Sequence, residues 1–162
     1  MSRLDSFIRR LQAQRACLDM AARLITDIDG LVLELGLGNG RTYDHLRETL
    51  PGREIYVCER QPAAHPDCTP PPDKLMLGDM RATLAAARPR FEGRVALAHL
   101  DAGSGEAADN RALADETLPL LLPLLASGAV LASDPSFDCA ELSPIPLPAD
   151  IAPGRYHLYR RR

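Results

Sequence analysis

Short, nearly continuous apolar runs alternate with longer amphipathic segments along most of the chain. A run of about four to eight apolar residues is typical of a strand covered on both faces, whereas apolar residues spaced three and four apart predict a helix. The predicted strands are residues 31–35, 54–59, 74–77, 94–100 and 129–133. The predicted helices are residues 4–25, 41–50, 80–88 and 110–126.

Proline and glycine mark where several of these elements should end. The helix over residues 80–88 should stop before Pro89, and Pro119 and Pro123 should kink or split the last helix. Ser127-Gly128 should close that helix. Residues 60–73 hold five prolines and should be irregular, and a last strand is expected within residues 155–160.

Strands that alternate with helices predict a doubly wound α/β fold, in which right-handed crossovers cover both faces of a mostly parallel sheet. We expect one domain over residues 1–162. It would comprise an N-terminal covering helix in residues 1–26, a core in residues 31–134 and C-terminal strands in residues 135–162. Ligands of such sheets bind outside the carboxyl ends of the strands, so polar residues at those ends are the candidate site residues.

Composition and charge narrow the function classes. Hydrophobic residues make up 46% of the chain and the net charge is −3, which favours neither nucleic acid nor a membrane as partner. Aromatic residues make up only 4%, so platforms for base stacking are scarce. The most apolar stretch, residues 118–132, is too short to cross a bilayer. We expect a cytoplasmic protein with reduced cysteines. The formation of a homo-oligomer stays open.

A glycine-rich turn follows the first predicted strand, where Gly36, Gly38 and Gly40 precede a helix. Glycine has no Cβ and tolerates positive φ, so a ligand can approach the backbone closely. The amide groups of residues 39–42 lie at the N-terminus of that helix and favour a carboxylate. Tyr43, in the first helical turn, can reach the same ligand. By themselves, however, three glycines could serve only a tight turn.

Two further polar signals stand at the ends of the second and third predicted strands. Glu59, followed by Arg60, ends the second strand, where a carboxylate can accept hydrogen bonds from both hydroxyl groups of a ribose. Asp79 follows Gly78 after the third strand and can accept a hydrogen bond from an adenine amino group, or cap the next helix. Met80 offers apolar cover to the ring. Together with the glycine turn, these residues predict an adenosine site.

The order of these residues resembles the class I S-adenosylmethionine (SAM)-dependent methyltransferase family. The resemblance rests on Glu34-Leu35-Gly36-Leu37-Gly38-Asn39-Gly40, the strand-end Glu59, the Gly78-Asp79 pair and Asp101 after the fourth strand, and it covers residues 31–134. It implies a Rossmann-like seven-stranded sheet in the order 3-2-1-4-5-7-6 with the last strand antiparallel. The proline-rich residues 62–72 depart from the family, which usually has a helix there.

This resemblance implies SAM as the cofactor and assigns roles around it. The glycines would line the methionine part, Glu59 would hold the ribose, and Asp79 would contact the adenine. Glu34 would support the glycine turn from within the first strand, and Asp101 would lie beside the methionine amino group or the substrate. The predicted cofactor-binding residues are Glu34, Gly36, Gly38, Asn39, Gly40, Thr42, Tyr43, Glu59, Arg60, Gly78, Asp79, Met80 and Asp101.

Two other chemistries fit these residues less well. A nicotinamide dinucleotide fold has the fingerprint Gly-x-Gly-x-x-Gly, which the turn does not match. Asp101 and Asp134 follow neighbouring strands and are candidates for a catalytic or metal-binding role. In catechol O-methyltransferase-like enzymes, aspartates at these places bind Mg²⁺ with a following Asn. Here Pro135 follows Asp134 and supplies no side-chain ligand, so no metal is assigned. His99 is expected to be packed and hydrogen-bonded.

The sequence therefore predicts a SAM-dependent methyltransferase that acts on a small-molecule acceptor by in-line methyl transfer. Because a sulfonium donor is already activated, the protein chiefly positions the acceptor, and the sequence assigns no base. We expect the acceptor pocket beneath the N-terminal helix, near Gln14, Leu18 and Phe137. Two alternatives stay open. One is a non-catalytic SAM-binding module or subunit. The other is an aminopropyl transferase of the same fold, whose polyamine substrate would suit the acid-rich segment of residues 101–150.

Overall fold

The computed structural model describes residues 2–103 and 106–162. The helices are α1 (Arg3–Leu24), α2 (Arg41–Thr49), α3 (Met80–Phe91) and α4 (Ala107–Leu121), with the short 3-10 helices η1 (Pro66–Cys68) and η2 (Leu122–Leu124). The strands are β1 (Leu31–Leu35), β2 (Ile55–Glu59), β3 (Leu75–Leu77), β4 (Val95–Leu100), β5 (Leu125–Ser133), β6 (Leu142–Pro144) and β7 (His157–Arg161). None of the described helices combines the length and the apolar character that crossing a bilayer requires.

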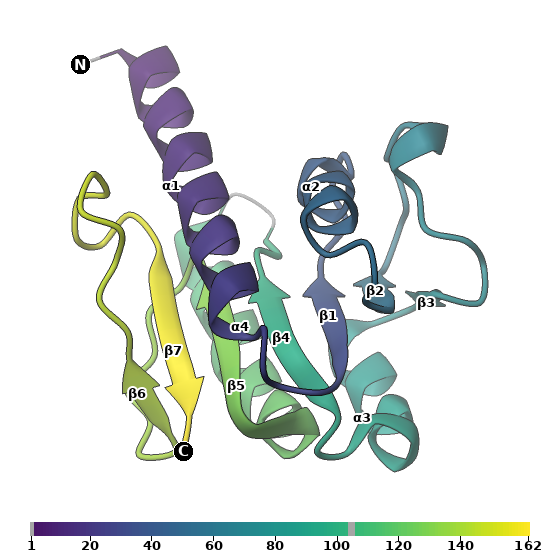
Figure 1. Cartoon of the computed structure of the whole chain (residues 1–162). Helices are drawn as coiled ribbons and strands as arrows, with labels where there is room; N and C mark the ends of the chain where they lie inside the picture. The colour runs from purple at the N-terminus through teal and green to yellow at the C-terminus, as the bar shows by residue number, and fades with distance from the viewer. Residues whose placement is uncertain (1, 104–105) are drawn as a thin grey trace.

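Within the described residues, seven strands form one sheet in the order β3-β2-β1-β4-β5-β7-β6. Strands β1 to β5 run parallel to one another, and β7 is antiparallel to both β5 and β6. Helices α1 and α2 cover one face of the sheet, and α3 and α4 cover the other (Figure 1). The predicted fold class and strand order are confirmed. Because the chain continues from β1 to β2 on one side and reaches β4 on the other, the switch point lies between β1 and β4.

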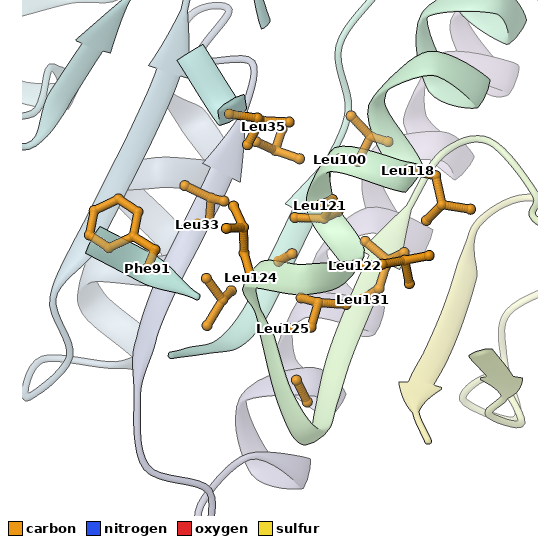
Figure 2. Close-up of a cluster of buried hydrophobic side chains, with 14 of the residues drawn as sticks. Leu33, Leu35, Phe91, Leu100, Leu118, Leu121, Leu122, Leu124, Leu125 and Leu131 are labelled. Atoms are coloured by element: carbon orange, nitrogen blue, oxygen red, sulfur yellow. The ribbon is translucent and has the colours of Figure 1, made fainter. Parts of the chain in front are cut away.

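Two hydrophobic cores, one on each face of the sheet, explain the apolar runs of the strands. On the face toward α3 and α4, Leu33 packs in one cluster with Phe91 and Leu121 (Figure 2). On the opposite face, Val32 packs in a second cluster with Leu18 of α1. Successive residues of a strand point to opposite faces, so a strand covered on both sides must be apolar at nearly every position. Glu34 is the exception in β1, and it is fully buried.

Helix α1 begins with a capping box. The Ser2 hydroxyl accepts a hydrogen bond from the Asp5 amide (3.0 Å), and the Asp5 carboxylate accepts one from the Ser2 amide (3.1 Å). The helix packs on the sheet through residues such as Cys17 and Ala21 and extends past the carboxyl ends of the parallel strands (Figure 1). From this position Arg10 and Gln14, in the middle of α1, reach Asp101 after the end of β4.

Two predicted boundaries are wrong. Helix α3 runs through Pro89 to Phe91, because the buried Phe91 ring packs on Tyr56 (centroids 4.7 Å apart) and holds the last turn in place. Strand β5 begins at Leu125 rather than at residue 129, because η2 ends the preceding helical segment and Leu125 pairs with Val95 of β4. The expected closing turn at residues 127–128 therefore lies inside β5.

Candidate cofactor-binding site

A cavity of about 790 Å³ lies at the carboxyl ends of the central strands, where the strand order reverses. The predicted residues that line it are Gly36, Gly38, Asn39, Glu59, Arg60, Gly78, Asp79, Met80 and Asp101. Further lining residues, which the sequence analysis did not single out, are Cys58, Gln61, Ala63, Arg81, Ala102, Gly103, Asp109, Asn110, Ala112, Leu113 and Glu116. The three strand-end signals of the sequence thus meet in one cavity.

Gly38 and Gly40 of the turn are required for different structural reasons. Gly38 has φ +51°, and a Cβ built on it would meet no atom within 4 Å, so its missing side chain leaves open space in the cavity wall. Gly40 has φ +79°, and a Cβ there would lie 2.4 Å from the carbonyl oxygen of Cys68. Gly40 does not line the cavity, contrary to the prediction. It lets the loop that contains Cys68 pack against the N-terminus of α2.

This difference predicts opposite behaviour for two alanine variants. Gly40→Ala should lower the melting temperature by roughly 5–10 °C, because left-handed strain and a backbone clash together cost about 2–3 kcal/mol. Gly38→Ala carries only the strain, about 1 kcal/mol, but it places a methyl group in the cavity wall. Thermal melting checks the first expectation, and ligand binding to the folded Gly38→Ala protein checks the second. Equal melting temperatures for the two variants would contradict this interpretation.

Glu59 is held rigidly at the end of β2. Its Oε2 accepts hydrogen bonds from the amides of Leu37 (2.8 Å) and Gly38 (3.3 Å), and its Oε1 accepts from Arg60 (2.7 Å) and Gln61 (2.9 Å). Partial burial by itself raises the pKa of Glu59, but the four backbone N–H groups outweigh it and lower the pKa below its ordinary value. The carboxylate is therefore charged, fixed toward the glycine turn, and exposed to the cavity.

Asp79 is the N-cap of α3 and also lines the cavity. Its carboxylate accepts from the amides of Arg81 (3.0 Å) and Ala82 (3.3 Å), so the predicted alternative of a helix cap is realised. Hydrogen bonds from the Arg81 side chain lower the pKa of Asp79 to about 2. Arg81 also binds Glu116 of α4 (2.6 Å), so an ion pair joins α3 to α4 along this wall.

Helix α4 also lines the cavity, and the sequence predicts this contribution only in part. Asp109, Leu113 and Glu116 are spaced four and three apart, which places them on one face of a helix. That spacing does not reveal what the face contacts. The docking of α4 beside α3 turns it toward the cavity.

Asp101 directly follows β4, and side chains of α1 hold its carboxylate. Arg10 binds the Asp101 carboxylate through Nη2 and the Asp134 carboxylate through Nε (3.2 Å), and the Gln14 amide donates to the other oxygen of Asp101. Asp101 and Asp134, the two candidates for a catalytic or metal-binding role, thus share one guanidinium. Among the described residues, no group of three or more His, Cys, Asp or Glu side chains is arranged to hold a metal ion. Arg10 was missed because its partners lie about 90 and 120 positions away.

A second, smaller cavity of about 200 Å³ adjoins the first between α1 and the start of α2. The residues that both cavities share are Gly36, Gly38, Asn39 and Asp101. Gln14 lines this second cavity, as expected, but Leu18 and Phe137 do not. They are buried in the hydrophobic clusters on opposite faces of the sheet, which corrects the predicted acceptor pocket.

Two other predicted residues, Glu34 and Tyr43, lie behind the site. Glu34 is fully buried and accepts a hydrogen bond from the hydroxyl of Thr42, which lines the second cavity. Tyr43 does not line either cavity. It is buried in the cluster between α1, α2 and the sheet, because the first turn of α2 points this side chain toward the core. His99 is fully buried and hydrogen-bonded, as expected.

The comparisons with known proteins agree with this geometry. A family model described as S-adenosyl-L-methionine methyltransferase matches residues 1–161. The chain is similar over its whole length to the S-adenosyl-L-methionine methyltransferase of Silicibacter pomeroyi DSS-3, with 46% identity, a TM-score of 0.95 and coverage of 99% of that chain. Among curated proteins, no significant match was found.

More distant structures share the fold. Human methyltransferase-like protein 13, solved in complex with S-adenosylhomocysteine (SAH), has a TM-score of 0.55 and 13% identity, over 95% of this chain and 81% of that one. The sugar N-methyltransferase KedS8 from Streptoalloteichus sp. ATCC 53650 has a TM-score of 0.52 and 22% identity, over 89% of this chain and 60% of that one. From the family match, the relative with 46% identity and the strand order, the chain belongs to the S-adenosyl-L-methionine methyltransferase family, whose methyl donor is SAM.

Proposed function

We propose that this chain transfers the methyl group of SAM to a small-molecule acceptor. The observation that carries the proposal is the single cavity in which the glycine turn, Glu59, Asp79 and Asp101 converge. Its volume of about 790 Å³ is within the usual range for cofactor-sized ligands. The small-molecule class is favoured by the relatives, since KedS8 is named as a sugar N-methyltransferase.

The residues present fit SAM part by part. Glu59 would hold the ribose hydroxyls, because its carboxylate is charged, fixed by backbone amides and open to the cavity. Asp79 and Met80 would take the adenine, with Arg60 and Gly78 beside them. In this proposal, Glu59 sets the position of the adenosine from which the rest of the cofactor extends.

The methionine end would extend to the junction of the two cavities. Gly36, Gly38 and Asn39 would line it, and Thr42 in the second cavity would lie near its carboxylate. Asp101 would hold the ammonium group in place of the Arg10 guanidinium, which is a cation on the same carboxylate. The charged pair of Asp101 and Arg10 at this position favours a zwitterionic amino acid group over an uncharged one.

When bound, SAM supplies a methyl group on a positively charged sulfur that is ready for in-line displacement. The chain would position the acceptor and exclude competing nucleophiles. Cys58 lines the cavity, but burial raises the pKa of its thiol to about 12, so it stays protonated and is not itself a methyl acceptor. Asp101 accepts hydrogen bonds from Arg10 and Gln14, and in this proposal it would hold the ammonium group of the cofactor, so it is not assigned as a base.

A thermal-shift titration tests cofactor binding. SAM and SAH should each stabilise the protein by about 2.7 kcal/mol at 100 times the dissociation constant, and NAD should not. For a chain of this size that corresponds to roughly 5–10 °C in melting temperature. Stabilisation by NAD alone, or by none of the three, would contradict the proposal.

A screen for SAH release tests the reaction. Amines, phenols, carboxylates and thiols of low molecular weight would be offered with SAM, and at least one class should raise SAH release above the rate without acceptor. The Glu59→Ala protein serves as the matched control for contaminating activity. Failure of all four classes with a protein that binds SAM would favour a non-catalytic binding role instead.

A further inference from the structure

The second cavity, of about 200 Å³, has an apolar side that α1 supplies. Phe7 and Leu11 line it from the N-terminal half of the helix. Large hydrophobic side chains are rarely exposed among the described residues, yet Leu4, Phe7 and Ile8 all are. Together with Leu11 they are spaced three and four apart, which places them on one face of the helix. An exposed apolar face beside a cavity is typical of a binding site.

The packing of α1 on the sheet explains only the second half of this apolar face. Leu18, two turns after Leu11, is buried in the cluster between α1 and the sheet. The first turns of α1 instead extend past the carboxyl ends of the parallel strands (Figure 1), and there Phe7 stays exposed at the rim of the second cavity. Its apolar surface is therefore available to a ligand.

Two arginines also line the second cavity, and they differ in their partners. Arg10 binds both Asp101 and Asp134, so it would keep one acid even if the ammonium group of the cofactor took Asp101. Arg41, the first residue of α2, is exposed, and no ion pair or hydrogen bond of its guanidinium is found within the described residues. A guanidinium binds a carboxylate through two parallel hydrogen bonds. Arg41 is therefore free to bind an anionic group.

Acidic side chains are scarce at the second cavity. In the part of the chain that the structure describes, Asp101 is the only acid that lines it, and Asp101 is paired with Arg10. Asp109 and Glu116, which belong to the acid-rich segment of residues 101–150, line the cofactor cavity instead. Because Arg41 is left unpaired, the second cavity favours an anion over a cation such as a polyamine.

We propose that the second cavity is the acceptor site and that the acceptor is an amphipathic anion, whose apolar body lies against Phe7 and Leu11 and whose carboxylate is bound by Arg41. This assignment rests on the proposed function, because the residues that both cavities share would place such a ligand beside the methionine end of SAM. Small aromatic or aliphatic carboxylic acids that carry a separate hydroxyl, amine or thiol group belong to this class.

The charge preference is tested by amide NMR titrations of the SAH-saturated protein with matched probes. The probes 4-phenylbutyrate, 4-phenyl-1-butanol and 4-phenylbutylamine share one apolar body and differ in charge, and hexanoate, 1-hexanol and hexylamine repeat the comparison with an aliphatic body. We expect each acid to bind with a dissociation constant at least about tenfold lower than its alcohol and its amine. The acids should shift the amide signals of Leu37 and Thr42, which line the second cavity.

Two variants separate the contributions of charge and apolar surface. Arg41→Gln should raise the dissociation constant of each acid about tenfold and leave that of each alcohol within about twofold. Phe7→Ser should weaken the acid and the alcohol alike, by about fivefold. The matched controls are Arg15→Gln and Leu77→Ser, at an exposed arginine and an exposed leucine that line neither cavity, and both should bind like the wild type. All four positions are exposed, so the variants should fold.

The outcomes separate the two proposals. If the wild type does not bind SAH, the proposed function fails and the acceptor site with it. If it binds SAH but neither acid binds more tightly than its alcohol and its amine, the anion preference is overturned. A loss of SAH binding in Arg41→Gln, with unchanged binding of 5′-methylthioadenosine, which lacks the amino acid end, would place Arg41 on the cofactor instead.

The apolar face of α1 has one competing explanation, a second copy of the chain. Sedimentation of the wild type and of Phe7→Ser distinguishes it from a ligand. A dimer that Phe7→Ser dissociates, with unchanged binding of the acids and alcohols, would overturn the apolar half of the acceptor site. A wild type whose oligomeric state Phe7→Ser leaves unchanged, together with the weaker probe binding, supports it.

Discussion

Replacing Glu59 by alanine is expected to weaken SAH binding by at least about 100-fold. Two hydrogen bonds from ribose hydroxyls to a charged carboxylate contribute about 1.5 kcal/mol each or more, and 1.4 kcal/mol corresponds to a factor of ten in affinity. A further loss is expected because the same carboxylate fixes the amides of Leu37 and Gly38 in the glycine turn. The truncation therefore removes a ligand contact and loosens the neighbouring wall.

Titration calorimetry with SAH and with 5′-methylthioadenosine measures this effect, and both ligands should be affected because both contain the ribose. Glu48→Ala is the control, since Glu48 is an exposed acid on α2 that lines neither cavity. Unchanged affinity of Glu59→Ala for both ligands would show that the ribose is held elsewhere. Melting curves of the variant separate loss of binding from loss of folded protein.

Replacing His99 by leucine is expected to lower the free energy of unfolding by about 3 kcal/mol at neutral pH. The substitution leaves the Glu34 carboxylate buried without its charged partner, and breaking a buried pair in this way costs about 3–5 kcal/mol. The double variant Glu34→Leu/His99→Leu should recover much of this loss, since it removes both groups at once. Denaturant unfolding of the two variants measures the difference. His65→Ala, at an exposed histidine, should cost less than about 1 kcal/mol.

The same pair predicts how stability depends on pH. Burial by itself lowers the pKa of His99, but the charge of Glu34 and its hydrogen bond outweigh burial, so the pKa lies above its ordinary value. Asp101 raises the pKa further and Arg10 lowers it. Below the unfolded pKa, about 6.5, the pair contributes its full stability. Between the unfolded and folded pKa values only the native state holds the proton, so stability falls as pH rises.

The wild type should therefore lose stability relative to the double variant as pH increases above about 6.5. Using the double variant as reference removes the effect of His157, whose pKa is lowered by burial and which acts in the opposite direction. Parallel stability profiles for the wild type and the double variant from pH 6 to 9 would contradict a protonated His99 in the native state.

The residues that line the cavity at the strand ends could be predicted from the sequence because each of their signals is local. Gly38, Glu59 and Asp79 each follow a strand of apolar residues, and the carboxyl ends of parallel strands meet at one edge of a sheet. The alternation of strands and helices predicts that sheet. These residues could therefore be placed together without knowledge of a single long-range contact.

Element boundaries were less well predicted where tertiary packing competes with local propensity. On local grounds Pro89 should end α3 at residue 88, but the burial of Phe91 carries the helix three residues further. Tyr43 shows the same effect on side-chain direction. It lies in the first turn of α2, three residues after Gly40, yet the docking of α2 against α1 buries its ring instead of turning it to the cavity.

By itself, the sequence determined the fold class, the strand order through its family resemblance, and the strand-end residues Glu59 and Asp79 that line the cavity. The tertiary structure alone decided how α1 crosses the strand ends, and so brought Arg10 and Gln14 to Asp101 across about 90 positions of sequence. It also joined His99 to Tyr156 across 57 positions. Such contacts depend on how amphipathic elements dock, and hydrophobic periodicity specifies which face is buried but not which partner buries it.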